Sequence, residues 1–321
     1  MDVDAPKINQ DTGITFKRIN NDNLARFLNT VTFGIIANEA IEAEITATDK
    51  GSGLKDIHYE VKDQATNAVK TSGDKTADSQ GKIRITLAPE APQANVYIVA
   101  YAVDVAGNQG AAATSANALL EANKPEAELV LGTPETDNNW YTEAVNYTLK
   151  VKDSDSGLEN VRVYETDEIK TDFSGEIPSF EKDFNGETTE QEITDSTPAI
   201  NTAGTHHITL VVTDKAGNEI RTSKTVKLET VVPPLSVHSY TYNEGNKEDY
   251  NSTTTGRDVY LAPSLTDNFL SGNNIVQVSR SATENGTYGD WENINLAQSG
   301  VHKITEEGDY WYQFRSISLA G

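Results

Sequence analysis

The chain has 321 residues, of which 36% are hydrophobic and 23% charged, and 26 basic against 49 acidic residues give a net charge of −23. It contains no cysteine, which excludes a disulfide, a thiolate nucleophile and a thiolate-bound metal. The negative charge repels phosphate groups and argues against nucleic acid and anionic membranes as partners.

The two ends of the sequence predict a fragment of a longer chain. The start, "MDVDAPKINQ", has neither the basic nor the apolar region of a signal peptide, and no run of 18 apolar residues follows. We therefore expect no membrane insertion in this fragment. The end, "SLAG", stops where two earlier copies of a similar phrase continue with asparagine. The last strand of the final repeat is thus expected to be missing.

Helical spacing is confined to one segment near the N-terminus. In "NNDNLARFLNTVTF" (20–33), Leu24, Phe27 and Leu28 lie at positions i, i+3 and i+4, which predicts one short helix. Elsewhere, segments such as 145–151 and 207–213 alternate apolar with polar or β-branched residues. This period of two is typical of half-buried strands.

Two short phrases recur at the distance of a domain. D-x-A-G-N begins at Asp104 and again at Asp214, 214 − 104 = 110 positions later. A strand, an aspartate and Ser-Gly-Leu recur from Asp49 and from Asp153, 153 − 49 = 104 positions apart. Because two separate landmarks advance by nearly the same step, we predict tandem repeats. A third, divergent copy carries Asp267, an insertion before Ser271-Gly272, and Ser318 in place of the aspartate of the second phrase.

Proline-containing linkers, "EANKPEAEL" (121–129) and "ETVVPPLSV" (229–237), divide the chain into predicted domains 1–122, 123–230 and 231–321. About seven short strands per repeat, separated by frequent turns, predict an all-β chain of three tandem immunoglobulin-like β-sandwich domains. The short linkers predict a semi-rigid rod.

The recurrent phrases are predicted to be structural turns. D-x-A-G-N suits the hairpin between the last two strands of a domain: the aspartate caps backbone amides, glycine takes φ above zero and asparagine tolerates a similar conformation. The Ser-Gly-Leu phrase is expected to join two earlier strands. The predicted turn residues are Asp49, Ser52, Gly53, Asp104, Gly107, Asn108, Asp153, Ser156, Gly157, Asp214, Gly217 and Asn218.

These phrases resemble a known family. "WYTEAVNYTLKVKDSDSGLENVRVYE…HHITLVVTDKAGNE" resembles bacterial immunoglobulin-like (Big-type) repeats of large exported proteins. "FLNTVTFGIIANEAIEAEITATDKGSGLKDIHYEV" is similar to first modules of Gram-positive surface proteins, and "DYWYQFRSISLAG" to closing strands of modules that accompany glycosidases. The resemblance covers most of the chain. It implies a cell-surface stalk or an accessory module and transfers no catalytic residue.

Few residues of the sequence are candidates for catalysis or metal binding. The five histidines have no ligand spacing, and no nucleophile elbow, P-loop or dinucleotide-binding motif is present. We therefore expect neither enzymatic activity nor a cofactor. Calcium is one open alternative, because Asp49, Asp153, Asp155 and Asp214 lie on loops expected at one end of each sandwich, where they would gather at a joint. Turn capping is the favoured explanation of these aspartates.

The tryptophans Trp140, Trp291 and Trp311 could form a sugar-stacking platform, although core packing is the favoured interpretation. We expect a non-enzymatic, monomeric stalk region of an acidic, adhesion-related protein on the bacterial cell surface or wall. The alternative is a carbohydrate- or host-ligand-binding accessory module of an exported glycosidase. A host or matrix protein or a glycan is the expected partner in either case.

Overall fold

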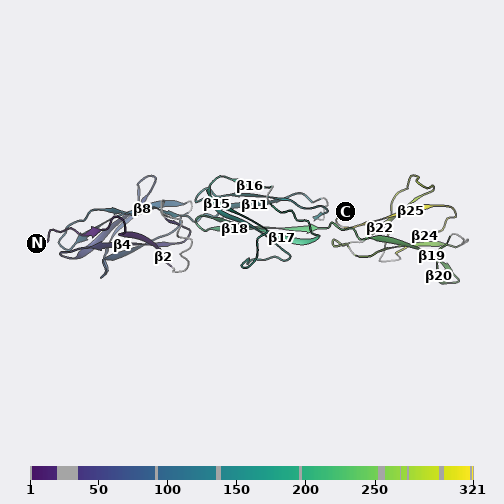
Figure 1. Cartoon of the computed structure of the whole chain (residues 1–321), viewed down its shortest axis with the longest axis horizontal. Coiled ribbons are helices and arrows are strands. Elements are labelled where there is room, and N and C mark those ends of the chain that lie inside the picture. Colours follow the sequence, from purple (N-terminus) through teal and green to yellow (C-terminus); the bar gives the residue numbers. More distant parts are fainter. Residues whose placement is uncertain are drawn as a thin grey trace.

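The computed structural model describes residues 2–19, 35–90, 93–134, 139–194, 197–251, 257–267, 269–272, 275–295, 300–318 and 320. All the elements in these ranges are β-strands, and they form three sandwiches in a row (Figure 1). Each strand ladder in these ranges lies within one sandwich. The helix expected within 20–33 falls outside the described residues.

The second sandwich has a complete immunoglobulin-like topology. Its smaller sheet has the order β11-β13-β16, from β11 (Glu126–Leu131), β13 (Tyr147–Lys152) and β16 (Gln191–Ile193). Its larger sheet has the order β12-β18-β17-β14-β15, from β12 (Trp140–Tyr141), β14 (Leu158–Thr166), β15 (Phe180–Glu187), β17 (Gly204–Asp214) and β18 (Glu219–Leu228). Strand β12 pairs parallel to β18, and the remaining ladders are antiparallel.

The first sandwich repeats this plan. In one sheet β4 (Ile41–Thr48) pairs with β7 (Lys82–Leu87) on one side and with β1 (Lys7–Ile8) and β2 (Ile14–Arg18) on the other. The other sheet has the order β3-β10-β8-β5-β6, from β3 (Ile35–Ala37), β5 (Leu54–Asp63), β6 (Val69–Thr76), β8 (Ala94–Asp104) and β10 (Ala118–Leu120). Strand β9 (Ala113–Thr114) also pairs with β8. As in the second sandwich, a short parallel ladder, here β3 with β10, closes the sheet.

The third sandwich is more open. One sheet has the order β20-β19-β21-β24, from β19 (Leu235–Asn243), β20 (Asn246–Asp249), β21 (Val259–Leu265) and β24 (His302–Ile304). The other has the order β23-β22-β25, from β22 (Ile275–Ser281), β23 (Glu292–Ile294) and β25 (Trp311–Ile317). Strand β25, which corresponds to β17, is the last strand among the described residues.

Each of the first two sandwiches encloses an aliphatic core between its sheets. Alternation places Tyr147, Leu149 and Val151 of β13 inward, where they pack with the opposite sheet. The buried cluster of the third sandwich is smaller and consists, among the described residues, of Val276, Val278 and Ile294. The third repeat therefore has less apolar burial to fix its two sheets against each other.

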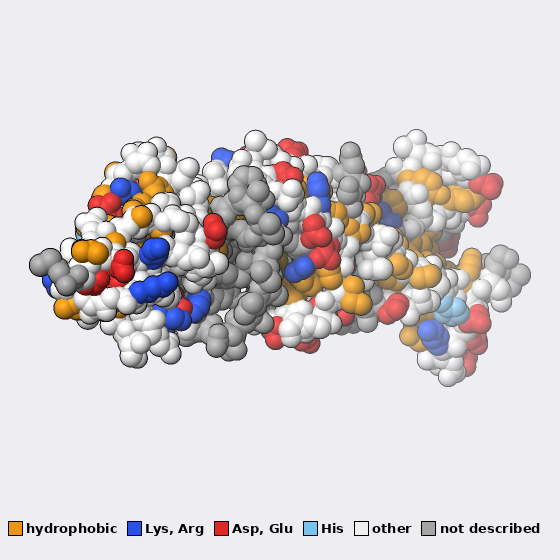
Figure 2. Space-filling model, turned by 60° about the vertical axis from the view of Figure 1, so that its left-hand side comes forward, with side chains coloured by type: hydrophobic (Ala, Val, Ile, Leu, Met, Phe, Trp, Pro, Cys, Tyr) orange, Lys and Arg blue, Asp and Glu red, His pale blue; other side chains and the backbone are white. Residues whose placement is uncertain are grey.

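The outer surface follows the acidic composition. Figure 2 shows aspartate and glutamate side chains spread along all three sandwiches on the face in view, with no single acidic patch. Among the described residues, no helix has the length and apolar character needed to cross a membrane.

A buried glutamate on the outer face of the first sandwich is paired with three basic residues. Glu44 on β4 is 5% exposed and contacts Lys17 Nζ at 2.9 Å, Lys82 Nζ at 2.9 Å and Arg84 Nη2 at 3.0 Å. Hydrogen bonds from Lys82 and Lys17 lower the pKa of Glu44 from 4.5 to about 2. The ionised carboxylate therefore stabilises the fold above pH 4.5, and this contribution is lost as the pH falls toward 2.

We expect Glu44→Gln to lower the melting temperature at pH 7, because the substitution leaves three cations without their shared anion. The difference from the wild type should shrink as the pH falls from 4.5 to 2, where the native carboxylate is itself protonated. Circular dichroism melts of the whole chain across this range measure it. Glu42→Gln is the control, because Glu42 has a single ion pair among the described residues, with Arg84 at 3.3 Å. Equal pH profiles for the two variants would contradict the assignment.

Candidate functional site: the joints between the sandwiches

The D-x-A-G-N phrases form the hairpins that follow β8 and β17. Asp214 Oδ1 accepts a hydrogen bond from Asn218 N at 2.7 Å, and Asp214 Oδ2 accepts one from Asn218 Nδ2 at 2.9 Å. The same pair of bonds joins Asp104 to Asn108, at 2.7 and 2.8 Å. Gly107 and Gly217 have φ of 92° and 93°. Asn108 and Asn218 do not have positive φ, in contrast to the expectation from the sequence. Asparagine suits this turn because its side chain donates a hydrogen bond to the aspartate.

The Ser-Gly-Leu phrases connect one sheet to the other, from β4 to β5 and from β13 to β14. Asp49 Oδ2 accepts hydrogen bonds from Gly51 N at 2.9 Å and Gly53 N at 2.7 Å. Asp153 caps its own turn in the same way, through Asp155 N at 3.0 Å and Gly157 N at 3.1 Å. Gly53 and Gly157 adopt φ of 90° and 84°, the left-handed region that favours glycine.

A serine joins the two turns in each sandwich. Ser52 Oγ accepts a hydrogen bond from Ala106 N at 3.0 Å, and Ser156 Oγ accepts one from Ala216 N at 3.2 Å. In the third repeat Ser271 Oγ accepts from Ala320 N at 3.2 Å, although the sequence of both turns has diverged there. The predicted turn residues thus come together at one end of each sandwich, even though they lie about 50 to 60 positions apart in each repeat.

A glutamate from the preceding sandwich enters this end. Glu121 and Glu229 each follow the last strand of a sandwich, and their amides donate to Ala37 O at 3.0 Å and Tyr141 O at 2.9 Å. Their carboxylates accept hydrogen bonds from the next sandwich: Glu121 Oε2 from Ser156 N at 3.1 Å, and Glu229 Oε1 from Ser271 N at 3.2 Å. We call each such contact an acid–serine joint.

The first sandwich has a related contact, because Asp2 accepts a hydrogen bond from Ser52 N. The asparagines of the hairpins also bond to these acidic residues: Asn108 Nδ2 donates to Asp2 O at 3.2 Å, and Asn218 Nδ2 donates to Glu121 O at 3.5 Å. The acids at the joints are not among the residues predicted from the sequence. Their signal is an acidic residue four positions before a proline, in "DVDAP", "EANKP" and "ETVVP" (2–6, 121–125 and 229–233).

The joint between the first two sandwiches buries several carboxylates together. Glu121 and Asp214 are 0% exposed and Asp153 is 4% exposed. Burial, with the negative charges of Asp153, Asp214 and Asp155 adding to it, raises the pKa of Glu121 from 4.5 to about 7. Burial likewise raises the pKa of Asp214 from 3.8 to about 6. The first joint therefore disfavours ionisation of acids that would be charged in solvent.

In the part of the chain that the structure describes, two groups of carboxylates have the spacing of a metal site. Oxygens of Glu121, Asp153 and Asp155 lie within 4.8 Å of one another, and so do those of Asp2, Asp49 and Asp104. Of the four aspartates that the sequence suggested for calcium, Asp153 and Asp155 are thus in one group and Asp49 is in the other. Asp214 acts on the first of these groups through its charge. Neither group includes a histidine.

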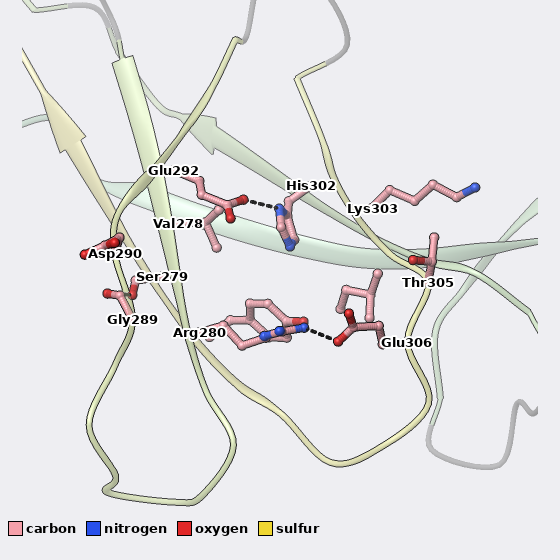
Figure 3. A pocket seen from close by; sticks show the side chains of 12 residues that line it. Val278, Ser279, Arg280, Gly289, Asp290, Glu292, His302, Lys303, Thr305 and Glu306 are labelled. Carbon is pink, nitrogen blue, oxygen red and sulfur yellow. Dashed lines mark hydrogen bonds and ion pairs between the residues drawn. The ribbon is translucent and has the colours of Figure 1, made fainter.

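The third sandwich contains a polar cavity of about 490 Å³ between its sheets. Arg280 of β22 pairs with Glu306 at 2.7 Å and lies over the Tyr310 ring, 4.6 Å from its centroid. Across the cavity, His302 Nδ1 lies 3.9 Å from Glu292 (Figure 3). Burial lowers the pKa of His302. The first two sandwiches have larger and mainly aliphatic clusters of buried side chains.

The tryptophans do not gather on one platform. Trp140 is 9% exposed on β12 of the second sandwich. Trp291, just before β23, is covered by the Arg315 guanidinium at 4.3 Å from the ring centroid, and Trp311 begins β25. The only adjacent histidines also diverge, since His206 pairs with Glu165 at 2.8 Å while His207 contacts Thr225 Oγ1 at 3.0 Å.

The glycines of the two Ser-Gly-Leu turns should differ in their tolerance of alanine. Both have positive φ, which costs a non-glycine residue about 1–2 kcal/mol. A Cβ at Gly53 meets nothing within 4 Å, whereas one at Gly157 would lie 2.4 Å from the Gly186 carbonyl. We expect Gly157→Ala to destabilise the chain by about 1–3 kcal/mol more than Gly53→Ala, the matched control. Equal losses in urea unfolding would refute this difference.

No protein-family model and no curated protein matches the chain. Three solved structures to which it is similar are latent PorU from Porphyromonas gingivalis (12% identity, TM-score 0.24), a tetra-tandem repeat in the extending region of a large adhesion protein (14%, 0.23) and a bacterial ice-binding adhesin (10%, 0.29). The alignments cover 90%, 88% and 88% of this chain and 31%, 71% and 81% of the others. The chain thus spans about a third of PorU.

Proposed function

We propose that this chain is a non-enzymatic spacer in a bacterial cell-surface protein, which holds an adhesive part of that protein away from the cell. The observation that carries the proposal is the acid–serine joint, which recurs at both boundaries between sandwiches. A linker that only connected two domains would need no such contact. A repeated contact between the end of one sandwich and the turns of the next fixes their relative direction.

The geometry of the joint supports a stiff spacer. The glutamate is tied by its amide to its own sandwich and by its carboxylate to the next one, so no flexible residue separates the two attachments. Hydrogen bonds to a carboxylate contribute about 1.5–3 kcal/mol each. The proline four residues further on restricts the linker as well. Figure 1 shows the sandwiches in a row, the arrangement that a spacer requires.

The cell-surface location and the adhesive role rest on the resemblance to Big-type repeats of exported proteins. The missing cysteines and the acidic surface are compatible with an exported protein that stays soluble without disulfides. We further propose that the spacer is monomeric, with a host or matrix protein or a glycan as the partner of the part that it carries.

Loss of the second joint should broaden the distribution of orientations between the second and third sandwiches. The chain has no cysteine, so nitroxide labels can be placed at single introduced cysteines without background. With labels at exposed Lys224 and Ala282, double electron–electron resonance should show a narrow distance distribution in the otherwise unchanged chain. Glu229→Gln with Ser271→Ala should widen it.

The control pair for this measurement is Ser72 with Lys224, which spans the first joint and should be unaffected by the change at the second. A broad distribution across the second joint in the otherwise unchanged chain would contradict the stiff spacer. So would a distribution that stays equally narrow after both substitutions, because the joint would then not be what orders the sandwiches.

A second candidate function is glycan binding by the third sandwich, which the polar cavity favours. Arg280, Glu306, Glu292 and His302 offer donors and acceptors around a hollow of about 490 Å³, within the size range of ligand pockets. Planar polar side chains of both charges suit the hydroxyl groups of a sugar, and the Tyr312 ring in the lining supplies apolar contact.

If the cavity binds sugars, the whole chain should bind members of a glycan array, and Arg280→Ala should weaken that binding about tenfold, or about 1.4 kcal/mol. Arg257→Ala is the matched control, because Arg257 pairs with Glu248 outside the cavity lining. Absence of binding to the array, or equal loss in both variants, would reject this second candidate.

A further inference from the structure

We propose that the joint between the first and second sandwiches is a calcium site formed by Glu121, Asp153 and Asp155, and that the second joint has no such site. The cation would stiffen one of the two joints only. This inference concerns the regulation of the proposed spacer and rests on that function for its significance. The site itself follows from the contacts at the first joint.

The first observation is the convergence of charge. One oxygen from each of the three carboxylates lies within 4.8 Å of the other two, and two of these side chains are buried. Two like charges 4 Å apart repel each other by about 4 kcal/mol at the effective dielectric constant near a protein surface. Asp214, itself fully buried, adds a further acid nearby. Charges packed in this way call for a compensating cation or for protonation.

The second observation is an unpaired oxygen. Glu121 is 0% exposed, and its Oε2 accepts a hydrogen bond from Ser156 N, yet its buried Oε1 has no hydrogen-bond partner. An unpaired buried carboxylate oxygen is unfavourable because it has lost its hydration. The charges that act most strongly on Glu121 are all acidic. Lys215, in the neighbouring hairpin, donates its Nζ to Phe184 O.

The geometry suits calcium in particular. Calcium binds oxygen ligands at about 2.3–2.6 Å, so two oxygens on opposite sides of the ion can be about 4.8 Å apart. The oxygens of the first joint meet this limit as they stand. Magnesium requires about 2.0–2.1 Å and near-ideal octahedral geometry, which a set of carboxylates from a linker and a loop is less suited to provide.

The second joint lacks both observations. Glu229 occupies the place of Glu121, but both of its oxygens are paired, with Ser271 N at 3.2 Å and Ser271 Oγ at 2.7 Å. Ser318 stands where the second sandwich has Asp214, and its Oγ accepts a hydrogen bond from Ala320 N. Within the described ranges, no carboxylate group with metal spacing includes Glu229. Its hydrogen bonds therefore satisfy this joint without an ion.

The test compares matched variants of the whole chain. Calcium titration by isothermal calorimetry, after removal of metals with a chelator, should show binding to the wild type with a dissociation constant of about 10⁻⁴–10⁻³ M, the range of extracellular modules. Glu121→Gln and Asp155→Asn should each lose one site or weaken it at least tenfold. Glu229→Gln, the matched control at the second joint, should bind calcium like the wild type.

Calcium bound by the group of Asp2, Asp49 and Asp104 would also appear in the titration. The measured quantity is therefore the difference in calcium binding between the wild type and Glu121→Gln. Folding of each variant is checked by circular dichroism, and Asp155→Asn serves where Glu121→Gln does not fold. Equal calcium binding by the wild type, Glu121→Gln and Asp155→Asn would overturn the proposal. So would no binding at millimolar calcium, or stronger binding of magnesium than of calcium.

Spin labels at Ser72 and Lys224 separate this inference from the spacer function. Calcium should narrow the distance distribution across the first joint and leave the distribution between Lys224 and Ala282 unchanged. If the chain binds no calcium but its distance distributions are narrow, the spacer function stands and the calcium site is rejected. If the chain binds calcium at Glu121 but the distance distributions across both joints stay broad, the calcium site stands and the spacer function is rejected.

Discussion

The three sandwiches are linked by one recurrent interaction, the hydrogen bond between a serine amide at the corner of one sandwich and a carboxylate that extends from the sandwich before it. The serine hydroxyl at the same position accepts a bond from the hairpin of its own sandwich. A single residue therefore connects the two turns of a sandwich and receives the preceding one. Three independent cores become one array through contacts that involve few side chains.

The acid–serine joint differs in chemistry between the two boundaries. At the second joint a serine hydroxyl and a serine amide satisfy both oxygens of Glu229. At the first joint Ser156 directs its hydroxyl to Asp153 at 3.3 Å, so Glu121 keeps one unpaired oxygen among other acids. Burial and neighbouring charge then raise the pKa of Glu121. The same repeat plan thus produces one joint that is complete in itself and one that favours a cation or a proton.

The third sandwich differs in a way that follows from its smaller core. Where the first two repeats fill the space between their sheets with aliphatic side chains, the third places Arg280, Glu306 and His302 there. Arg280 and Glu306 pair there at 2.7 Å and keep part of their surface exposed to solvent, which limits the cost of placing charged groups between the sheets. This repeat thus combines divergent turns and a polar interior with a smaller buried apolar cluster than those of the other two repeats.

The sequence by itself determined the local chemistry of this protein: strands from a period of two, sandwiches from strand number, and turns from aspartate and glycine at fixed offsets. These features depend on neighbours along the chain, so a pattern can reveal them. The tertiary structure alone decided that Ser156 meets both Ala216 and Glu121, and that Asp153 and Asp155 share a site with an acid of the linker. The two contacts of Ser156 join residues 35 positions apart across two sandwiches and 60 positions apart within one. They depend on how whole sheets pack, and no local pattern encodes that distance.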